Sequence, residues 1–241
     1  MTEQQAYESA RVTGVSALVE AATFIFGFAL FATVLADYTS QEFGPAESAT
    51  FLADHDLTFY MWHFVILIIF GLVLIPLALS LRDLLAPRSP FLASLTLALG
   101  LIWAGLVIAA GMIANIGIAT VSDLLETDSP QAAAVWSAID AVQDGLGGGN
   151  EIVGGLWTLL VSYAALRQAL FPRALAVLGL VVGVAGIVTV VPELEDAGAV
   201  FGLGLIVWFA WLGVFTLRKA QATELDEEQP QLGASRRVRS G

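Results

Sequence analysis

The chain has 241 residues, of which 57% are hydrophobic and only 13% are charged. A soluble domain of this size does not need so much apolar surface, and several runs reach the roughly 20 apolar residues that cross a hydrocarbon core. The net charge of −12 excludes nucleic acid as a partner, because nucleic-acid-binding proteins present a basic surface. With no cysteine, the chain holds no disulfide, thiolate metal site or cysteine nucleophile.

The apolar runs predict an all-α fold, a polytopic membrane helix bundle with about six transmembrane helices. We expect a polar cytoplasmic lead over residues 1–11 and a disordered cytoplasmic tail over residues 218–241. The first run is too long for the apolar core of a secretion signal, and the third is long enough to tilt or to project beyond the membrane. The predicted spans cover residues 12–35, 57–81, 91–121, 150–170, 174–191 and 200–217.

Two shorter helices are predicted outside the spans. One follows Pro45 in the polar loop between the first two spans. The other covers residues 130–144, where Pro130 marks a helix start and apolar residues recur at helical spacing from Ala132 to Val142. We expect this amphipathic helix to lie on the outer membrane surface or over the bundle, as a connection between spans three and four. A lid is the alternative role.

The basic residues sort to one side of a six-span topology. Arginines precede span one and separate spans two from three and four from five, and further basic residues follow span six. The opposite loops contain acidic residues but no lysine or arginine. By the positive-inside rule the basic side is the cytoplasm, so we expect the protein in the cell membrane with both termini inside. The acidic exterior should attract cations.

The segment Leu146–Gly155, LGGGNEIVGG, joins the amphipathic helix to span four. Its three consecutive glycines allow a sharp turn. Asn150 is a good helix N-cap, and Glu151 then falls in the first helical turn, where the helix dipole favours an anion. The segment is either a well-made cap or the wall of a polar cavity at the mouth of the bundle. The pair Gly154–Gly155 predicts that a neighbouring helix or a ligand comes very close.

Polar side chains at membrane depth are costly, so each marks a candidate functional site. Glu20 lies roughly 13 Å inside Arg11 along a helix, and must be protonated, paired or in contact with a wet cavity. His63 and Asn115 lie near the outer ends of spans two and three. The predicted outward-facing pocket therefore consists of Glu20, His63, Asn115, Asn150 and Glu151, with Glu20 at its floor. The alternatives are an interfacial aromatic belt for His63 and a hydrogen bond between helices for Asn115.

A metal site is an alternative for the same region. Asp54, His55, Asp56 and His63 are suitable ligand types for zinc or another divalent ion, although their spacing matches no strong motif. The two histidines would lie about 12 Å apart along one helix, which argues against their binding both faces of one haem iron. No lysine lies within a predicted span, which excludes a covalently bound retinal. The sequence does not identify a cofactor.

The second half of the chain resembles a known family. The matching segments are GGGNEIVGGLW at Gly147–Trp157, LFPRALAVLGLVVGVAGIVTVVP at Leu170–Pro192 and FGLGLIVWFAWLG at Phe201–Gly213. They resemble a family of small bacterial and archaeal membrane proteins with about six helices and no known function, and the resemblance covers most of the chain from Val12 to Leu217. It implies a helix bundle and no established activity, so no catalytic residue follows from it.

The sequence thus predicts an integral membrane protein that binds a small ligand or ion in an outward-facing polar pocket, for transport, for sensing or as an assembly subunit. Glu20 would exchange the proton in such a pocket. The expected partners are the lipid bilayer, a small ligand or cation, and further copies of the chain or partner membrane subunits. The sequence favours a protein without enzymatic activity. Two alternatives stay open: an intramembrane metal-assisted hydrolase acting on lipid, and a structural or accessory subunit without chemistry.

Overall fold

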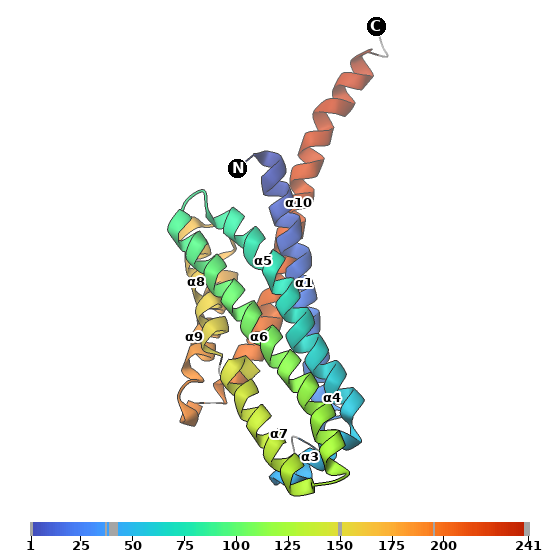
Figure 1. The fold of residues 1–241 in the computed structure, drawn as a ribbon. Helices are drawn as coiled ribbons and strands as arrows, with labels where there is room; N and C mark the ends of the chain where they lie inside the picture. The colour runs from blue at the N-terminus through green and yellow to red at the C-terminus, as the bar shows by residue number, and fades with distance from the viewer. Residues whose placement is uncertain (1, 37, 39–42, 149–150, 195, 239–241) are drawn as a thin grey trace.

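The computed structural model shows an elongated bundle of helices (Figure 1). It describes residues 2–36, 38, 43–148, 151–194 and 196–238. No β-strand occurs among these residues, which confirms the predicted all-α fold.

Four stretches of helix are long and apolar enough to cross a membrane. They are α1 (Glu3–Ala32), the continuous stretch Asp56–Leu85, α6 (Pro90–Leu125) and the first part of α10, Ala197–Ala222. They coincide with the predicted spans one, two, three and six. Their length and composition indicate a membrane protein.

The predicted spans four and five fall on shorter helices. α8 (Ile152–Gln168) has 17 residues and α9 (Arg173–Val188) has 16, and the two pack against each other. Both are shorter than the 20 or so residues that cross the hydrocarbon core without tilt or thinning. Four spans are therefore supported by length, and the count of six stays a prediction.

The two terminal helices extend further than predicted. α1 begins at Glu3, because the Thr2 hydroxyl accepts a hydrogen bond from the Gln5 amide and the Gln5 side chain accepts one from the Thr2 amide. Most of the predicted polar lead is therefore helical. α10 runs from Ala197 to Val238, over most of the stretch predicted to be disordered. Helix-forming residues follow Arg218, with no glycine or proline before Pro230, so nothing stops the helix where the apolar run ends.

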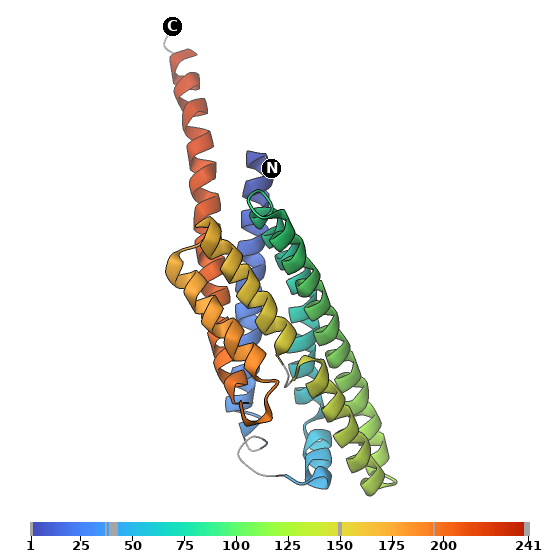
Figure 2. The ribbon, with the colours of Figure 1, turned by 90° about the vertical axis from the view of Figure 1, so that its left-hand side faces the viewer.

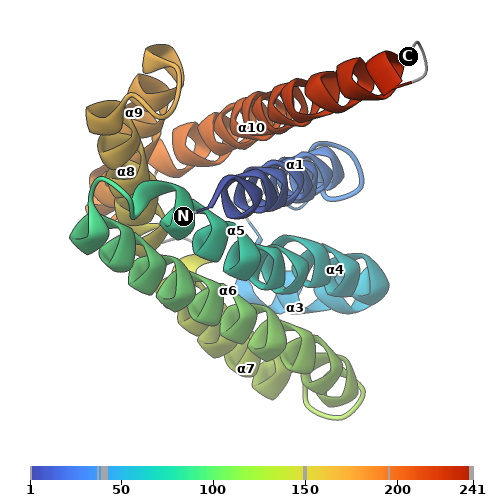
Figure 3. The same cartoon turned by 90° about the horizontal axis from the view of Figure 1, so that it is seen from above.

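α1 lies between α10 and α5, as the view along the bundle shows (Figure 3). α1 and α10 are antiparallel, and Gly14 of α1 lies against Leu217 of α10 while Gly213 lies against Leu18. Both chain ends therefore lie at one end of the molecule (Figures 1 and 2). The connections between α5 and α6 and between α8 and α9 lie toward the same end.

α7 (Ser129–Gln143) and α8 follow one another along α6 in the opposite direction (Figure 2). Gly117 of α6 lies against Ile139 of α7, and Trp103 of α6 lies against Gly154 of α8. α7 and α8 therefore run in the same direction along α6, with an interruption of the helix between them. The interruption is η2 (Asp144–Gly148), where Gly147 has a φ of 122°, a conformation that strongly favours glycine.

A second hydrophobic core lies at the end away from the termini. It is formed by α3 (Pro45–Asp54), α4 (Asp56–His63), the last turns of α6, and α7, which we call the distal lobe. Leu52, Phe59 and Trp136 are among its buried side chains. α3 and α7 lie where the sequence predicts helices after Pro45 and over residues 130–144. α7 packs on α6 and α3, so it covers other helices of the lobe.

The main core lies between α1, α5 (Phe70–Leu85), α6, α8, α9 and α10. Between α4 and α5 the chain forms a π-helix, η1 (Phe64–Ile69). Glycines bring the main helices close together, as predicted: a Cβ added at Gly155 of α8 would lie 2.7 Å from the carbonyl oxygen of Gly183 on α9. This contact fixes α8 and α9 to each other next to the interruption.

Candidate functional site

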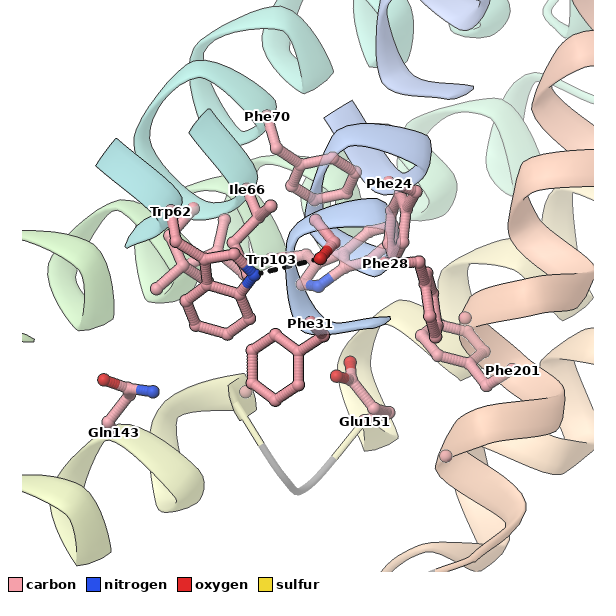
Figure 4. Close-up of a pocket in the computed structure, with 16 residues that line it drawn as sticks. Phe24, Phe28, Phe31, Trp62, Ile66, Phe70, Trp103, Gln143, Glu151 and Phe201 are labelled. Atoms are coloured by element: carbon pink, nitrogen blue, oxygen red, sulfur yellow. Dashed lines mark hydrogen bonds between the residues drawn. The ribbon is translucent and has the colours of Figure 1, made fainter. Parts of the chain in front are cut away.

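A cavity of about 320 Å³ lies where the main bundle meets the distal lobe (Figure 4). It is lined by the second half of α1, the stretch from α4 to α5, the middle of α6, the interruption η2 and the start of α10. Aromatic rings dominate its wall: Phe24, Phe28, Phe31, Trp62, Phe70, Trp103 and Phe201. We call it the aromatic cavity.

Two polar side chains reach the aromatic cavity, Gln143 and Glu151. The Glu151 carboxyl points into the space beside the ring of Phe31 (Figure 4). It makes no hydrogen bond and no ion pair with any residue that the structure describes. The Gln143 side chain is buried, and its Oε1 also lacks a partner there. The Glu151 carboxyl therefore lies beside aromatic rings, and no cationic side chain of the described residues lines this cavity with it.

The position of Glu151 is set by the start of α8. Glu151 occupies the N-cap position, one residue later than the sequence predicts, without a side-chain capping hydrogen bond. Its amide donates a hydrogen bond to the Thr189 hydroxyl over 2.9 Å. The Thr189 hydroxyl donates in turn to the Gly186 carbonyl oxygen over 2.7 Å. The end of α9 therefore fixes the backbone of Glu151, while its side chain stays directed at the cavity.

The Glu151 carboxyl is enclosed without a charged partner among the described residues. Removing water disfavours the charged form of such a carboxyl group, whereas a cation brought beside it favours that form.

Two irregular helical segments, η1 and η2, border the aromatic cavity. Ile66 and Leu67 of the π-helix η1 line one wall, and Gly147 of the interruption η2 lines another. π-helical segments occur frequently at functional sites, since they break the regular hydrogen-bond ladder. Trp62 Nε1 donates a hydrogen bond to the Gly27 carbonyl oxygen over 3.3 Å, which joins α1 to α4 across the cavity (Figure 4).

Ring contacts continue from the cavity wall into the main core. The rings of Phe24 and Phe70 meet edge to face with centroids 5.3 Å apart, and Phe70 meets Trp103 in the same way at 5.0 Å. Trp157 and Phe209 extend the cluster further into the bundle. Rings of this size at contact distance form a tightly packed apolar wall.

Glu20 lies outside the aromatic cavity, one helical turn before the lining residue Phe24. It is fully buried, and neither carboxyl oxygen has a hydrogen-bond partner among the described residues. It shares a buried face of α1 with Thr13, Ser16 and Thr23. Glu20 is thus enclosed, but it is not among the residues that line the aromatic cavity, where the sequence placed it at the floor of the pocket.

His63 and Asn115 do not line the aromatic cavity either. His63 is buried, and its ring meets that of Trp62 edge to face with centroids 4.9 Å apart. Asn115 is buried one turn from Gly111, which lies beside the backbone of His63, and its Oδ1 has no partner among the described residues. Asn150 lies outside the described residues. Of the residues predicted to share one pocket, the structure places only Glu151 in this cavity.

The predicted metal ligands lie along α3 and α4. Asp54 and Asp56 are exposed, and the His55 ring stacks on Phe51 with its Nδ1 3.0 Å from the Phe51 carbonyl oxygen. His63 lies at the far end of α4. In the described part of the chain, no group of three or more His, Cys, Asp or Glu side chains is placed to hold a metal ion.

The pocket predicted from the sequence does not include the aromatic residues that line the cavity. The sequence does contain a pattern that relates to them, since Phe24, Phe28 and Phe31 recur at helical spacing and share a face of α1. The same spacing is typical of side chains that face lipid, so it does not single out a cavity without knowledge of what α1 packs against.

A family model described as a domain of unknown function, DUF4386, matches residues 12–220. The chain belongs to the DUF4386 family. The DUF4386 match includes every residue that lines the aromatic cavity, together with Glu20, and it agrees with the resemblance found in the sequence. DUF4386 carries no known activity. No curated protein and no solved structure matches the chain.

Proposed function

We propose that this DUF4386 protein crosses the cell membrane six times and binds a small amphipathic organic cation from the outside in its aromatic cavity, for transport or for sensing. The observation that carries the proposal is the unpaired Glu151 carboxyl in a wall of aromatic rings.

Helix lengths support an outward-facing cavity. Three residues that line the cavity lie at the same distance from a basic residue on the same helical segment. The pairs, each 16 residues apart, are Gly27 with Arg11, Glu151 with Arg167, and Gly202 with Arg218. At helical rise this separation is about 24 Å, close to the roughly 30 Å thickness of the hydrocarbon core. The basic residues belong on the cytoplasmic side by the positive-inside rule, so the cavity lies near the outer surface.

The lining favours an organic cation. Aromatic faces attract cations because of their quadrupole, and the same rings cover an apolar ligand body. Glu151 supplies the single counter-charge, because it is the only ionisable residue among the described residues that line the cavity. A bare metal ion would need several oxygen ligands in place of rings.

Glu20 supports proton coupling as the mechanism of transport. An ionised carboxylate without a partner would cost several kcal/mol at this position, so Glu20 is neutral as it stands. The helices that pack against this part of α1 carry no ionisable residue from Phe64 to Leu81 or from Ala197 to Leu217. Buried hydroxyl groups, including Thr13 hydrogen-bonded to Ser80 over 2.8 Å, lie between Glu20 and the basic end. Glu20 would take up and release its proton along this face.

Calorimetric titration of the purified protein with benzyltrimethylammonium tests the binding step. We expect saturable binding, and we expect Glu151→Gln to lower the affinity by about tenfold or more, since a charge-assisted contact contributes about 1.5–3 kcal/mol. Glu126→Gln is the matched control, because Glu126 is an exposed acid of the distal lobe and should leave the affinity unchanged. Neopentylbenzene, the neutral isostere of the probe, should bind more weakly. Equal affinity of Glu151→Gln and the unchanged protein would overturn the proposal.

The same probe tests the role of Glu20 in proteoliposomes that contain a pH-sensitive dye. We expect a gradient of benzyltrimethylammonium to drive proton movement in the opposite direction. Glu20→Gln should keep the affinity for the probe and lose this proton movement, because Gln has no proton to exchange. Proton movement that persists in Glu20→Gln would show that Glu20 does not couple transport to protons.

A further inference from the structure

We propose that a second cavity, at the end of the molecule where the termini lie, binds the phosphate group of an anionic membrane lipid. This cavity of about 640 Å³ lies between the α5–α6 connection and the end of α8. Its lining consists of Arg88, Ser89, Leu92, Arg167, Gln168 and Ala169, and we call it the arginine cavity. It shares no lining residue with the aromatic cavity, and the proposal does not depend on the function proposed above.

The two arginines are held by neutral acceptors and not by acids. Arg88 Nη1 donates a hydrogen bond to the Gln168 carbonyl oxygen over 2.6 Å, and the Gln168 side chain donates to the Leu85 carbonyl oxygen over 3.3 Å. These bonds brace the two connections against each other. Arg167 Nη1 donates to the Tyr163 hydroxyl over 3.2 Å, and its guanidinium carbon lies 5.9 Å from the centre of that ring.

Neither arginine forms an ion pair among the residues that the structure describes, and no acidic residue lines the cavity. A guanidinium group has five N–H donors, so each arginine keeps most of its donors available. Two cations beside one cavity repel each other, and a phosphate relieves this repulsion because its oxygens accept hydrogen bonds from both.

The start of α6 adds further donors to the arginine cavity. Ser89 precedes Pro90, the first residue of the 36-residue helix, and its hydroxyl makes no capping hydrogen bond. The amides of Phe91 and Leu92 lie in the first helical turn, where no intrahelical acceptor exists for them. A helix start of this kind favours an anion, which adds to the charge of the arginines.

The position of the cavity favours a lipid over free phosphate. Phe91 is 78% exposed although it is large and apolar, and it begins the apolar stretch of α6 beside the cavity. A basic cavity at the end of membrane helices lies at the depth of lipid headgroups, and an exposed ring there faces acyl chains. A lipid would place its phosphate against Arg88 and Arg167 and its chains along the apolar start of α6.

Native mass spectrometry of the full-length protein tests this site with phosphatidylglycerol and, for comparison, phosphatidylcholine with the same acyl chains. We expect the protein to retain phosphatidylglycerol preferentially. Arg167→Gln should lower this retention by about tenfold, the effect of one charge-assisted contact. Because Arg167 bonds only within its own helix, this variant leaves the bracing by Arg88 intact. Arg173→Gln is the matched control, since Arg173 is an exposed arginine of the same connection and does not line the cavity.

Each outcome is decisive. Selective loss in Arg167→Gln, with retention in Arg173→Gln, supports the site. An equal loss in both variants would show that the whole basic end attracts anionic lipids, which overturns a specific site. The lipid proposal would be overturned if millimolar inorganic phosphate displaces phosphatidylglycerol from the unchanged protein and also binds the protein in the absence of lipid. The arginine cavity would then be a site for free phosphate.

Discussion

Glu151 is the residue on which the proposed binding site depends most. Its backbone belongs to the start of α8, while its carboxyl lies in the aromatic cavity without a partner. A quaternary ammonium ligand does not titrate, so any change of its affinity near neutral pH must come from the protein.

We expect the affinity for benzyltrimethylammonium to increase with pH. The cation prefers the ionised carboxyl group, so its binding is weaker wherever this carboxyl is protonated. Calorimetric titrations between pH 6 and pH 9 measure the dependence. A flat profile in the unchanged protein would contradict the assignment, and Glu151→Gln should be flat.

The sequence singled out Glu151 and Glu20 for a physical reason, because carboxyl groups are costly at membrane depth and few occur there. It did not single out the aromatic lining. A ring that faces a cavity and a ring that faces lipid have the same helical spacing, as Phe24 and Phe28 illustrate. It also placed His63 and Asn115 in the same pocket as Glu151 from their depth alone, whereas depth does not say which helix face a residue occupies.

At the scale of elements, the close contact of α8 with α9 determines where Glu151 lies. A Cβ at Gly155 would meet the carbonyl oxygen of Gly183 and the amide of Ile187, each at 2.7 Å. Backbone atoms on a packed helix cannot move aside as a side-chain tip can. The contact therefore requires glycine, and it lies one helical turn from Glu151.

We expect Gly155→Ala to destabilise the protein by about 1–3 kcal/mol, the usual cost of overpacking. Gly105→Ala is the matched control, because a Cβ there would meet no atom within 4 Å, and alanine favours a helix. Thermal unfolding of both variants in detergent measures the difference. If Gly155→Ala melts at the same temperature as Gly105→Ala, then α8 and α9 do not pack as the structure shows.

The sequence predicted most elements but not their irregularities. The stretch that forms η1 is an unbroken apolar run, so nothing in it distinguishes a π-helix from an α-helix. The third predicted span was expected to tilt or project, and α6 does continue into the distal lobe. The lobe itself was not predicted, because its core forms between helices that are far apart in sequence.

At the scale of the whole molecule, a topology with four spans and one with six spans both place the two termini on the same side of the membrane. The two topologies differ in the position of α8 and α9. The connection between these helices lies on the cytoplasmic side only if both helices cross the membrane. Six spans are supported by the bonds from Arg88 and from Gln168, which join this connection to that between α5 and α6. Short helices need a thinner or locally deformed bilayer to cross, at a modest cost.

Single cysteines decide between the two topologies, because the chain has none of its own. The variants are Gln4→Cys, Glu126→Cys and Ala174→Cys, each at an exposed position. With six spans, a membrane-impermeant maleimide applied to intact cells should label only Glu126→Cys, and opening the membrane should expose the other two. Labelling of Ala174→Cys together with Glu126→Cys in intact cells would mean that α8 and α9 do not cross. Labelling of Gln4→Cys without Glu126→Cys would reverse the orientation, and the aromatic cavity would then open toward the cytoplasm.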